Sequence, residues 1–440
     1  MNAPAALLLL FLQAQPSRTL PEVLEAVRTR TGIPGIAAAV VRDGKIVASS
    51  AAGVREDGNP DPVTLRDRWL VGSCTKSMTR LLLARLVERG VLRFDMTLAE
   101  AFPGVPMQEA YRKATIVDLA RHTAGLPPYT RIGPRMTPFI FTLGGSPAER
   151  RAAFAAHVLE EPPAAEPGRF LYSNAGFALL GALIERKAGR PFEELMASEV
   201  FGPLGMTSAV IGLDAARAIG PVPVGHEHEG SRYRVEPGGP PVSGLFAPAG
   251  GVVLSIEDFA RFAIAEAALE AGKASPVVGA ATAARVPSIL PADASTGEGA
   301  VLLGGQGTYT AGFAVWPSSQ VGVVVATNGG DSDEVVEGAV DALRSAYAPE
   351  LPAPPRRPPH GPPLGVMIHP GDEGELVVDG VAPGSPAERA GLAKNDRITA
   401  VDGRPVKGMD RDGLMAALRK PGARLSVLRG GQTVEVALPP

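Results

Sequence analysis

Short apolar runs predict β-strands near both ends of the long N-terminal part of the chain. Ile36–Arg42 and Lys45–Ser50 are rich in β-branched and small apolar residues, and an Asp-Gly pair separates them. Such a pair between two strand-like runs is typical of a two-residue hairpin turn. Gly312–Trp316 and Val321–Thr327 have the same character much later in the sequence, so strands are expected there as well.

Helical periodicity fills the sequence between these strands. In Ser73–Arg89, apolar residues recur at a spacing that puts them on one face of a helix. Further helices are expected at Ile116–His122, Ala148–Leu159, Asn174–Ala188, Pro191–Val200, Ser255–Leu269 and Glu334–Tyr347. Strands at both ends with helices between them predict one antiparallel sheet built from both chain ends, flanked by helices, with a helical subdomain inserted. The expected fold class is α/β, or more narrowly α+β.

A proline-rich segment divides the chain. Half of the residues in Ala348–Pro363 are proline, which neither a helix nor a central strand accommodates, so this segment is expected to be a stiff linker. It separates a domain at residues 16–347 from a small β-rich domain at residues 364–440.

The first 15 residues have the character of a targeting segment. Met1–Gln15 contains an unbroken apolar stretch at Ala5–Leu12, which is typical of a signal peptide and predicts export to the periplasm or secretion. An apolar first turn of the folded protein is the alternative, because no lysine or arginine precedes the stretch. No apolar run reaches the roughly 18 residues that a transmembrane helix requires.

Composition and charge exclude several classes of protein. Of the 440 residues, 45% are hydrophobic and 20% are charged, which is typical of a globular protein and argues against global disorder. The formal net charge is −3, so there is no basic excess for binding nucleic acid. Because Cys74 is the single cysteine, neither an intrachain disulfide nor a cysteine-based zinc site is possible.

Four residues carry the candidate chemistry. Ser73 and Lys76 form a Ser-x-x-Lys motif at an expected strand-to-helix junction, and this spacing puts the lysine one helical turn from the serine, where a neutral amine can take the hydroxyl proton. Tyr172 and Asn174 stand two residues apart before another expected helix. They add a second proton-transfer group and an amide that can orient a carbonyl. The Ser-x-x-Lys motif alone is a weak signal, and the conjunction of all four residues is what points to catalysis.

Together these motifs resemble the serine β-lactamase and penicillin-binding-protein superfamily, specifically its class C and esterase-like branch. The resemblance extends over about Leu20–Tyr347 and implies a β-lactamase/transpeptidase-like fold. It also implies roles for the four residues. Ser73 would be the nucleophile that becomes acylated, with its own N–H in the oxyanion hole, and Lys76 would be its base partner. Tyr172 would move the proton to the leaving group or activate the deacylating water, and Asn174 would contact Lys76 and the substrate.

The third motif of that superfamily is where this chain departs from the pattern. Relatives carry Lys-Thr-Gly or His-x-Gly before a strand, and here Gln306 is interpreted as the residue at the Lys/His position. The N–H of Tyr309 is then expected to be the second oxyanion donor. Because glutamine is neutral, it cannot pair ionically with the carboxylate that penicillins carry. The change therefore favours a neutral ester or amide substrate, or a slow or lost activity.

Other candidate residues rank lower. His122 lies in an expected turn and is interpreted as structural rather than catalytic. His226 and His228 have a His-x-His spacing that can bind zinc from a strand, but they lie in a stretch rich in glycine and proline without an obvious third ligand, so a solvated polar loop is favoured and no metal is expected. Cys74 is interpreted as a small buried side chain rather than a reactive thiol.

The C-terminal domain resembles a PDZ domain of the bacterial protease-associated type. Gly380–Leu392 and Asp396–Val406 predict a strand, a short helix, a second strand and a tight Asp-Gly turn. The resemblance implies a groove in which a peptide C-terminus adds as a strand, with a helix near Arg411–Arg419 as its other wall. The expected carboxylate-binding loop consists of Leu364, Gly365 and Val366. An inert docking module is the alternative.

The favoured function is a serine hydrolase that acts through an acyl-enzyme on Ser73, without cofactor or metal. An ester or amide is the leading substrate, followed by D-amino-acid peptides and β-lactams. The alternative is a catalytically weak or inactive penicillin-sensor-like or PDZ-scaffold binding protein. The expected partners are a small-molecule or peptide substrate and a peptide C-terminus at the PDZ domain.

Overall fold

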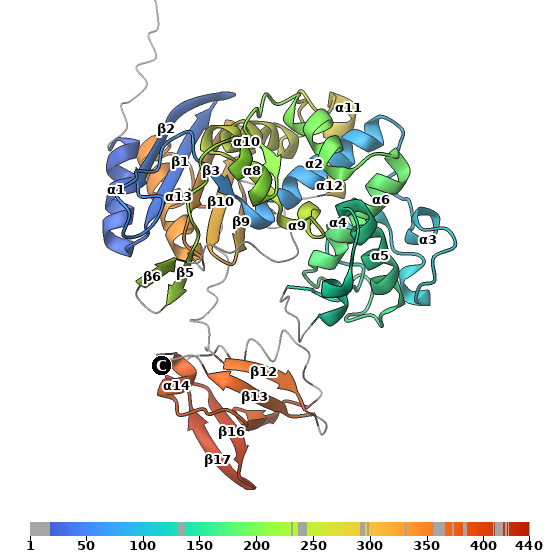
Figure 1. Cartoon of the computed structure of the whole chain (residues 1–440), viewed down its shortest axis with the longest axis vertical. Coiled ribbons are helices and arrows are strands. Elements are labelled where there is room, and N and C mark those ends of the chain that lie inside the picture. Colours follow the sequence, from blue (N-terminus) through green and yellow to red (C-terminus); the bar gives the residue numbers. More distant parts are fainter. Residues whose placement is uncertain are drawn as a thin grey trace, which may run out of the picture. The chain divides into compact units, whose positions relative to one another are not determined.

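The structure is a computed structural model that forms two compact units, Met1–Pro355 and Arg356–Pro440 (Figure 1). It describes residues 18–130, 137–229, 232–235, 244–290, 295–296, 299–330, 332–354, 366–371, 374–381, 385–407, 409, 417–418, 420 and 422–439. The boundary between the units falls inside the expected proline-rich linker. The expected signal peptide and residues 355–363 of the linker lie outside the described residues.

A six-stranded antiparallel sheet is the centre of the first unit, in the order β2-β1-β11-β10-β9-β8. Its strands are β1 (Gly35–Arg42), β2 (Lys45–Gly53), β8 (Ser295–Thr296), β9 (Gly299–Gln306), β10 (Tyr309–Trp316) and β11 (Val321–Thr327). Asp43 and Gly44 both have positive φ, as the expected hairpin turn requires. β1 pairs with β11 from Ile36 opposite Thr327 onward, which confirms a sheet built from both ends of the sequence.

Helices cover the two faces of this sheet. α1 (Leu20–Thr31) and α13 (Asp333–Tyr347) lie together on one face, where they share a core with alternate residues of β1 and β11 (Figure 1). α10 (Ile256–Glu270) packs on the other face against β1, β10 and β11. The larger core on that side also includes α2 (Thr75–Glu88), whose residues from Thr75 to Ala84 are all buried.

The inserted helical subdomain lies beside the sheet, at the right in Figure 1. The remaining helical segments of the first unit are α3 (Leu98–Ala101), α4 (Ile116–Ala120), α5 (Pro147–Glu160), α6 (Asn174–Ala188), α7 (Phe192–Met196), α8 (Leu213–Ile219), α9 (Ala247–Gly250), α11 (Ala280–Ala283), α12 (Val286–Ile289), the 3₁₀ turns η1 (Gly72–Cys74), η2 (Glu109–Tyr111), η3 (Pro138–Thr142) and η5 (Pro317–Ser319), and the π-helical η4 (Ala197–Phe201). The bounds of α6 are those expected from the sequence. The helix expected at Pro191–Val200 instead divides into α7 and η4.

Two small sheets complete the first unit. β3 (Arg68–Leu70) and β4 (Val210–Ile211) pair with opposite edges of β7 (Val252–Ser255). β5 (His226–Glu229) and β6 (Arg232–Val235) form a hairpin where a loop was favoured from the sequence. The backbone N–H of His226 also bonds the carbonyl of Asn328 and so ties β5 to the end of the main sheet, a contact that no local pattern reveals.

The second unit is a small antiparallel sheet with its own core, in the order β12-β13-β14-β16-β17. Its elements are β12 (Val366–Pro370), β13 (Leu376–Val381), α14 (Pro386–Arg389), β14 (Arg397–Val401), β15 (Arg404–Pro405), β16 (Arg424–Arg429) and β17 (Gln432–Ala437). Val366 begins β12, whereas Leu364 and Gly365 lie outside the described residues, as does most of the helix expected near Arg411–Arg419.

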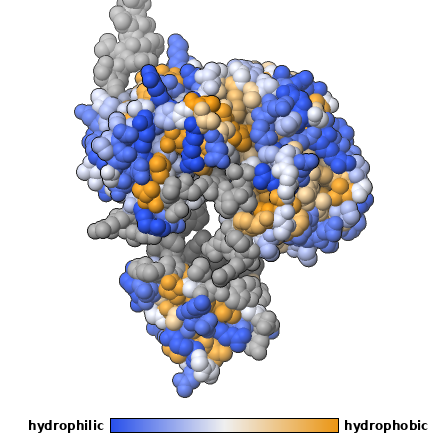
Figure 2. All heavy atoms as spheres, viewed as in Figure 1, coloured by the Kyte–Doolittle hydropathy of each residue, from blue (hydrophilic) through white to orange (hydrophobic). Residues whose placement is uncertain are grey.

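Polar residues cover most of the visible face of the first unit, with apolar patches between them (Figure 2). Among the described residues, no helix combines the length and the apolar character needed to cross a bilayer.

Candidate active site

Ser73 lies where a strand turns into a helix. It follows β3 and sits in η1, directly before α2. Gly72 has a φ of +50°, a conformation that glycine adopts at least cost. A side chain at Gly72 would also meet the backbone of β9 at about 3.1 Å. Glycine at position 72 therefore allows the backbone next to Ser73 to pack closely against β9, while Ser73 itself stays partly accessible.

Lys76 is one helical turn further along and is buried, with 2% of its surface exposed. Its Nζ lies 3.1 Å from Ser73 Oγ, 2.9 Å from Asn174 Oδ1 and 2.8 Å from the carbonyl oxygen of Ala249. All three acceptors are neutral. The spacing of the Ser-x-x-Lys motif therefore produces the contact expected from it, and the ammonium group has three hydrogen-bond acceptors for its three hydrogens.

Tyr172 completes a triangle with these two residues. Its hydroxyl lies 2.7 Å from Ser73 Oγ, and Lys76 Nζ lies 4.9 Å from the centre of its ring. The tyrosine comes from the segment just before α6, whose first turn is capped by Ser173 accepting from the N–H of Gly176. Residues distant in sequence thus meet at hydrogen-bond distance.

Asn174 is the first residue of α6 and is held at both ends of its amide. Its Oδ1 accepts from Lys76, and its Nδ2 donates to the carbonyl of Tyr129 at 3.1 Å. Its backbone N–H donates to the carbonyl of Pro128. These contacts determine which end of the amide faces the lysine, so Asn174 presents only an acceptor to it.

The glycine-rich end of β9 forms the third side of the site. A side chain at Gly304 in β9 would come within 2.6 Å of the backbone nitrogen of Ser73, so Gly304 is the residue that packs directly against the nucleophile, and the backbone of its neighbour Gly305 lies next to Gly72. If the Lys/His-x-Gly triplet of the relatives ends at this glycine, its first position is Leu302, which is 2% exposed. Gln306 follows later, at the end of β9, and its side chain lies outside the described residues.

Tyr309 is not brought to Ser73 by its side chain. It faces Gln306 across the hairpin that joins β9 to β10, and its hydroxyl donates to the carbonyl of Pro223 at 2.7 Å. Burial raises the pKa of Tyr309 to about 12. The role expected from the sequence is that of its backbone N–H as the second oxyanion donor, and this role stays a prediction.

His122 packs directly beside Tyr172. It is 2% exposed, its ring centre lies 4.5 Å from that of Tyr172, and its Nδ1 accepts the backbone N–H of Ser173 at 3.1 Å. Its backbone φ is +59°. The imidazole of His122 therefore supports Tyr172 from the side. From the sequence, His122 was expected only to have a structural role in a turn, and the structure places it closer to the site than that.

No role was expected from the sequence for the short helix α9. Besides the Ala249 carbonyl that accepts from Lys76, the Pro248 carbonyl accepts from Thr79 Oγ1 at 2.8 Å. A side chain at Gly181 of α6 would come within 2.4 Å of Pro248. The only sign of α9 in the sequence was the stretch Pro-Ala-Gly-Gly. Any residue can accept a hydrogen bond at its backbone carbonyl, so such acceptors cannot be recognised from the pattern of side chains.

The His-x-His pair does not form a metal centre within the described structure. His226 is fully buried; its Nε2 accepts from the N–H of Asp57 at 2.9 Å, and its Nδ1 lies 2.8 Å from the carbonyl of Asn328. His228 stacks on Tyr233. Among the described residues, no cluster of three possible ligands is present. Both nitrogens of His226 thus have structural partners.

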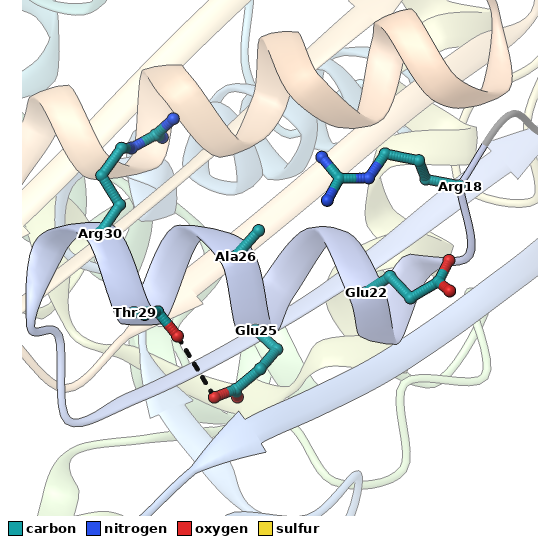
Figure 3. Close-up of a pocket in the computed structure, with 6 residues that line it drawn as sticks. All are labelled: Arg18, Glu22, Glu25, Ala26, Thr29 and Arg30. Atoms are coloured by element: carbon teal, nitrogen blue, oxygen red, sulfur yellow. Dashed lines mark hydrogen bonds between the residues drawn. The ribbon is translucent and has the colours of Figure 1, made fainter.

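A surface hollow elsewhere in the first unit is unrelated to the site. It runs along α1 and is lined by charged and small residues: Arg18, Glu22, Glu25, Ala26, Thr29 and Arg30 (Figure 3). Thr29 Oγ1 lies 3.5 Å from Glu25. α1 packs on the β2 edge of the sheet, whereas Ser73 lies over β9, so this hollow contains no candidate catalytic group.

Sequence comparison places the chain in a class of hydrolases. Residues 20–348 match the family model described as Beta-lactamase, and residues 377–428 match that of the PDZ domain. The chain therefore belongs to the Beta-lactamase family and carries a C-terminal PDZ domain, as the resemblance in its motifs indicated. Cys74 is fully buried, as expected from the sequence.

Individual relatives agree with this assignment. The chain is 31% identical over 192 residues to "Penicillin-binding protein 4" of Amycolatopsis lactamdurans, covering 42% of this chain and 46% of that protein. It spans about half the length of the curated relatives that it matches. Among solved structures, an octameric penicillin-binding protein homologue from Pyrococcus abyssi has a TM-score of 0.60 at 21% identity, covering 94% of each chain. The hydrolase EstCE1 also has a TM-score of 0.60, at 17% identity, covering 75% of this chain and 98% of its own. These two structures share the fold.

Proposed function

We propose that the protein is a serine hydrolase that acts through an acyl-enzyme on Ser73. The observation that carries this proposal is the closed set of contacts among Ser73, Lys76, Tyr172 and Asn174, with every polar contact between 2.7 and 3.1 Å. A protein that only binds ligands has no need for a buried lysine aimed at a serine hydroxyl. The contacts of Lys76 therefore favour an enzyme over the penicillin-sensor-like or scaffold alternative.

The hydrogen-bond partners of Lys76 indicate how it can act as a base. The Asn174 amide oxygen and the Ala249 carbonyl can only accept hydrogen bonds. A neutral Lys76 therefore donates its two hydrogens to them and turns its lone pair toward Ser73 Oγ. This geometry prepares the amine to take the hydroxyl proton as the serine attacks.

The proton balance of the reaction involves Tyr172. Ser73 Oγ bonds to the substrate carbonyl carbon while its proton passes to Lys76. When the tetrahedral intermediate collapses, the bond to the leaving group breaks, Tyr172 protonates that group, and Lys76 returns a proton to the tyrosine. Water then attacks the acyl-enzyme, loses a proton by the same route and releases the acid, which restores the Ser73 hydroxyl.

The second oxyanion donor is proposed to be the N–H of Gly305. Gly307 and Thr308 form a two-residue turn, and the residues that flank such a turn exchange both backbone hydrogen bonds. The N–H of Tyr309 is thereby committed to Gln306, whereas the next residue of β9, Gly305, turns its N–H outward. With the N–H of Ser73 nearby, this gives two donors for the developing oxyanion.

The register of β9 can be tested with two glycine variants. In Gly304→Ala the new methyl group meets backbone atoms of Val71, Ser73 and Cys74 at 2.4–2.6 Å, whereas in Gly305→Ala the nearest atom is 3.9 Å away. We expect kcat/KM to fall about 100-fold in the first variant, because β9 must move away from Ser73 and take the Gly305 N–H with it, an effect comparable to losing one oxyanion donor, and to change little in the second. Equal losses in both variants would contradict this register.

The proposed substrate is a neutral ester or amide. Neither Leu302 nor Gln306 can carry a positive charge, so the position that holds Lys or His in relatives offers no ionic partner to a substrate carboxylate. β-Lactams and D-amino-acid peptides carry such a carboxylate and are therefore less favoured. The neutrality of this position holds in either register of the strand.

The deciding experiment is intact-mass spectrometry of the full chain and of Ser73→Ala. Each protein is incubated separately with a fluorophosphonate, a p-nitrophenyl ester and a penicillin. We expect a Ser73-dependent fluorophosphonate adduct together with turnover of the ester. A stable penicillin adduct would favour a penicillin-binding role, and no adduct with any probe would favour the scaffold role. Tyr172→Phe serves as a matched variant, because it keeps the ring beside His122 and removes only the hydroxyl.

Peptide binding and export are proposed on separate grounds. The match to the PDZ domain supports recognition of a peptide C-terminus by the second unit, which deletion of residues 364–440 would test through loss of partner binding. Export rests on the apolar stretch at Ala5–Leu12. N-terminal sequencing of the protein recovered outside the cytoplasm of an expressing bacterium would reveal whether the segment is removed.

A further inference from the structure

Phe170 is an exposed aromatic ring beside the proposed proton donor. Among the large apolar side chains that the structure describes it is the most exposed, at 61%. It stands two residues before Tyr172 in the segment that leads into α6. Single exposed apolar side chains are common on protein surfaces. The inference therefore rests on the position of Phe170 relative to the reacting groups and not on its exposure.

Phe170 and Tyr172 both lie against the same buried imidazole. The Phe170 ring meets His122 edge-to-face, with ring centres 5.7 Å apart and planes at 82°, and Tyr172 lies 4.5 Å from the same ring. An edge-to-face pair is a favoured aromatic arrangement. The backbone N–H of Leu171, between the two rings, donates to the His122 carbonyl at 2.8 Å. The exposed ring is therefore held in place beside the catalytic tyrosine.

The position of Phe170 determines which part of a substrate it can touch. In the mechanism proposed above, the Tyr172 hydroxyl gives its proton to the leaving group, so the leaving group must lie next to that hydroxyl. A ring supported by the same histidine then lines the leaving-group side of the nucleophile. It offers no hydrogen bond and no charge, and it can only gain free energy by covering apolar surface.

We propose that Phe170 forms an apolar subsite for the leaving group, so that the enzyme favours esters of apolar or aromatic alcohols. This inference rests on the proposed function and deepens it from a neutral ester to one with an apolar leaving group. Selectivity is assigned to the alcohol side and not to the acyl side, because the ring packs on the same histidine as the proton donor.

The test compares acetate esters that differ only in the alcohol. In the full-length protein, kcat/KM for benzyl acetate and ethyl acetate gives a leaving-group selectivity. We expect this ratio to fall about tenfold in Phe170→Ala, a typical value for lost apolar contact in a substrate pocket, and to be kept within about twofold in Phe170→Tyr, which retains the ring. Phe141→Ala is the matched control, since Phe141 is 38% exposed in η3 and should leave the ratio unchanged.

The possible outcomes separate this inference from the proposed function. If the wild type hydrolyses esters through Ser73 but the ratio is unchanged in Phe170→Ala, the leaving-group subsite is wrong and the hydrolase stands. If the variant instead changes the selectivity between ethyl acetate and ethyl hexanoate, the ring contacts the acyl group and the assignment is again wrong. A change confined to the sedimentation coefficient would make Phe170 a contact between copies of the chain. Absence of any Ser73-dependent hydrolysis would overturn both proposals.

Discussion

Two buried cations in the first unit have opposite surroundings. Lys76, at the start of α2, has three neutral oxygen acceptors. Arg151, a residue of α5, is fully buried. It forms paired hydrogen bonds with the carboxylates of Glu185 on α6 and Glu193 on α7. Burial alone lowers the pKa of Arg151, but the bonds to the two carboxylates outweigh it, so its pKa is raised.

The difference separates a proposed proton-transfer group, Lys76, from a structural cation, Arg151. Two carboxylates stabilise a permanent positive charge on Arg151, which therefore joins three helices and also reaches the carbonyl of Gly244. No carboxylate is bonded to Lys76 among the contacts that the structure describes. Its neutral acceptors suit an amine that must gain and lose a proton during a reaction. The same degree of burial thus accompanies the proposed proton-transfer group in one place and a structural ion pair in the other.

The largest expected effect on activity is that of Lys76→Met. Methionine keeps most of the volume and removes the base, so kcat/KM should fall about 10³-fold, within the range for loss of a positioned proton-transfer group. The melting temperature should fall modestly, because the oxygens of Asn174 and Ala249 lose their donor while no buried carboxylate loses its partner. Ester hydrolysis and thermal unfolding are measured on the same preparation. Wild-type activity in this variant would contradict the role of Lys76.

Arg151→Met should have the reverse effect. Removal of the guanidinium leaves two carboxylates without their partner, which costs about 3–5 kcal/mol of unfolding free energy. The activity per folded molecule should remain, since Arg151 lies outside the proposed catalytic group. Urea denaturation combined with active-site titration separates the two quantities. A variant that is fully stable but inactive would contradict the comparison.

A smaller effect is expected for Thr79→Val, which probes the support of α9. The variant keeps the shape of the side chain and removes the hydrogen bond to the Pro248 carbonyl, leaving a buried acceptor unpaired at a cost of about 1–2 kcal/mol. Because α9 also supplies the acceptor for Lys76, kcat should fall modestly while KM is unchanged. Thr79→Ser is the control, since it retains the hydroxyl.

The smallest expected effect concerns an ion pair in the second unit, between Asp396 and Arg429. Burial raises the pKa of Asp396, but the hydrogen bonds from Arg429 and from the N–H of Ala393, with the charge of Arg429, together outweigh it and hold this pKa below its ordinary value of 3.8. This stabilisation is complete above pH 3.8 and is lost as the pH falls through the folded-state pKa. Asp396→Asn should therefore destabilise the second unit by at most about 1 kcal/mol at neutral pH, because Arg429 is partly exposed.

The measurement for this pair is calorimetry of the full chain at several pH values. The difference between Asp396→Asn and the wild type should shrink as the solution becomes acidic. A difference that is the same at pH 3 and pH 7 would show that the charge of Asp396 does not contribute.

Elements with strong local signals were predicted closely from the sequence. α6 has the expected bounds, and the β1–β2 hairpin follows from its Asp-Gly turn. The Ser-x-x-Lys contact follows from helical geometry alone. By contrast, α1 was missed although Thr19 and Glu22 form a capping box, and β9 was recognised only as a glycine-rich motif. Glycine strands have little hydrophobic pattern, so the sequence does not define their register.

The sequence by itself determined the family, the helix that joins Ser73 to Lys76, and the approach of Tyr172 and Asn174 as a pair, because each depends on residue types at short spacing. Only the tertiary structure decided which glycine faces the nucleophile, that Ala249 accepts from Lys76, and that Phe170 and Tyr172 share one histidine. These contacts join segments far apart in the chain, and several involve backbone atoms that every residue possesses. Local patterns therefore cannot encode them, and only packing selects them.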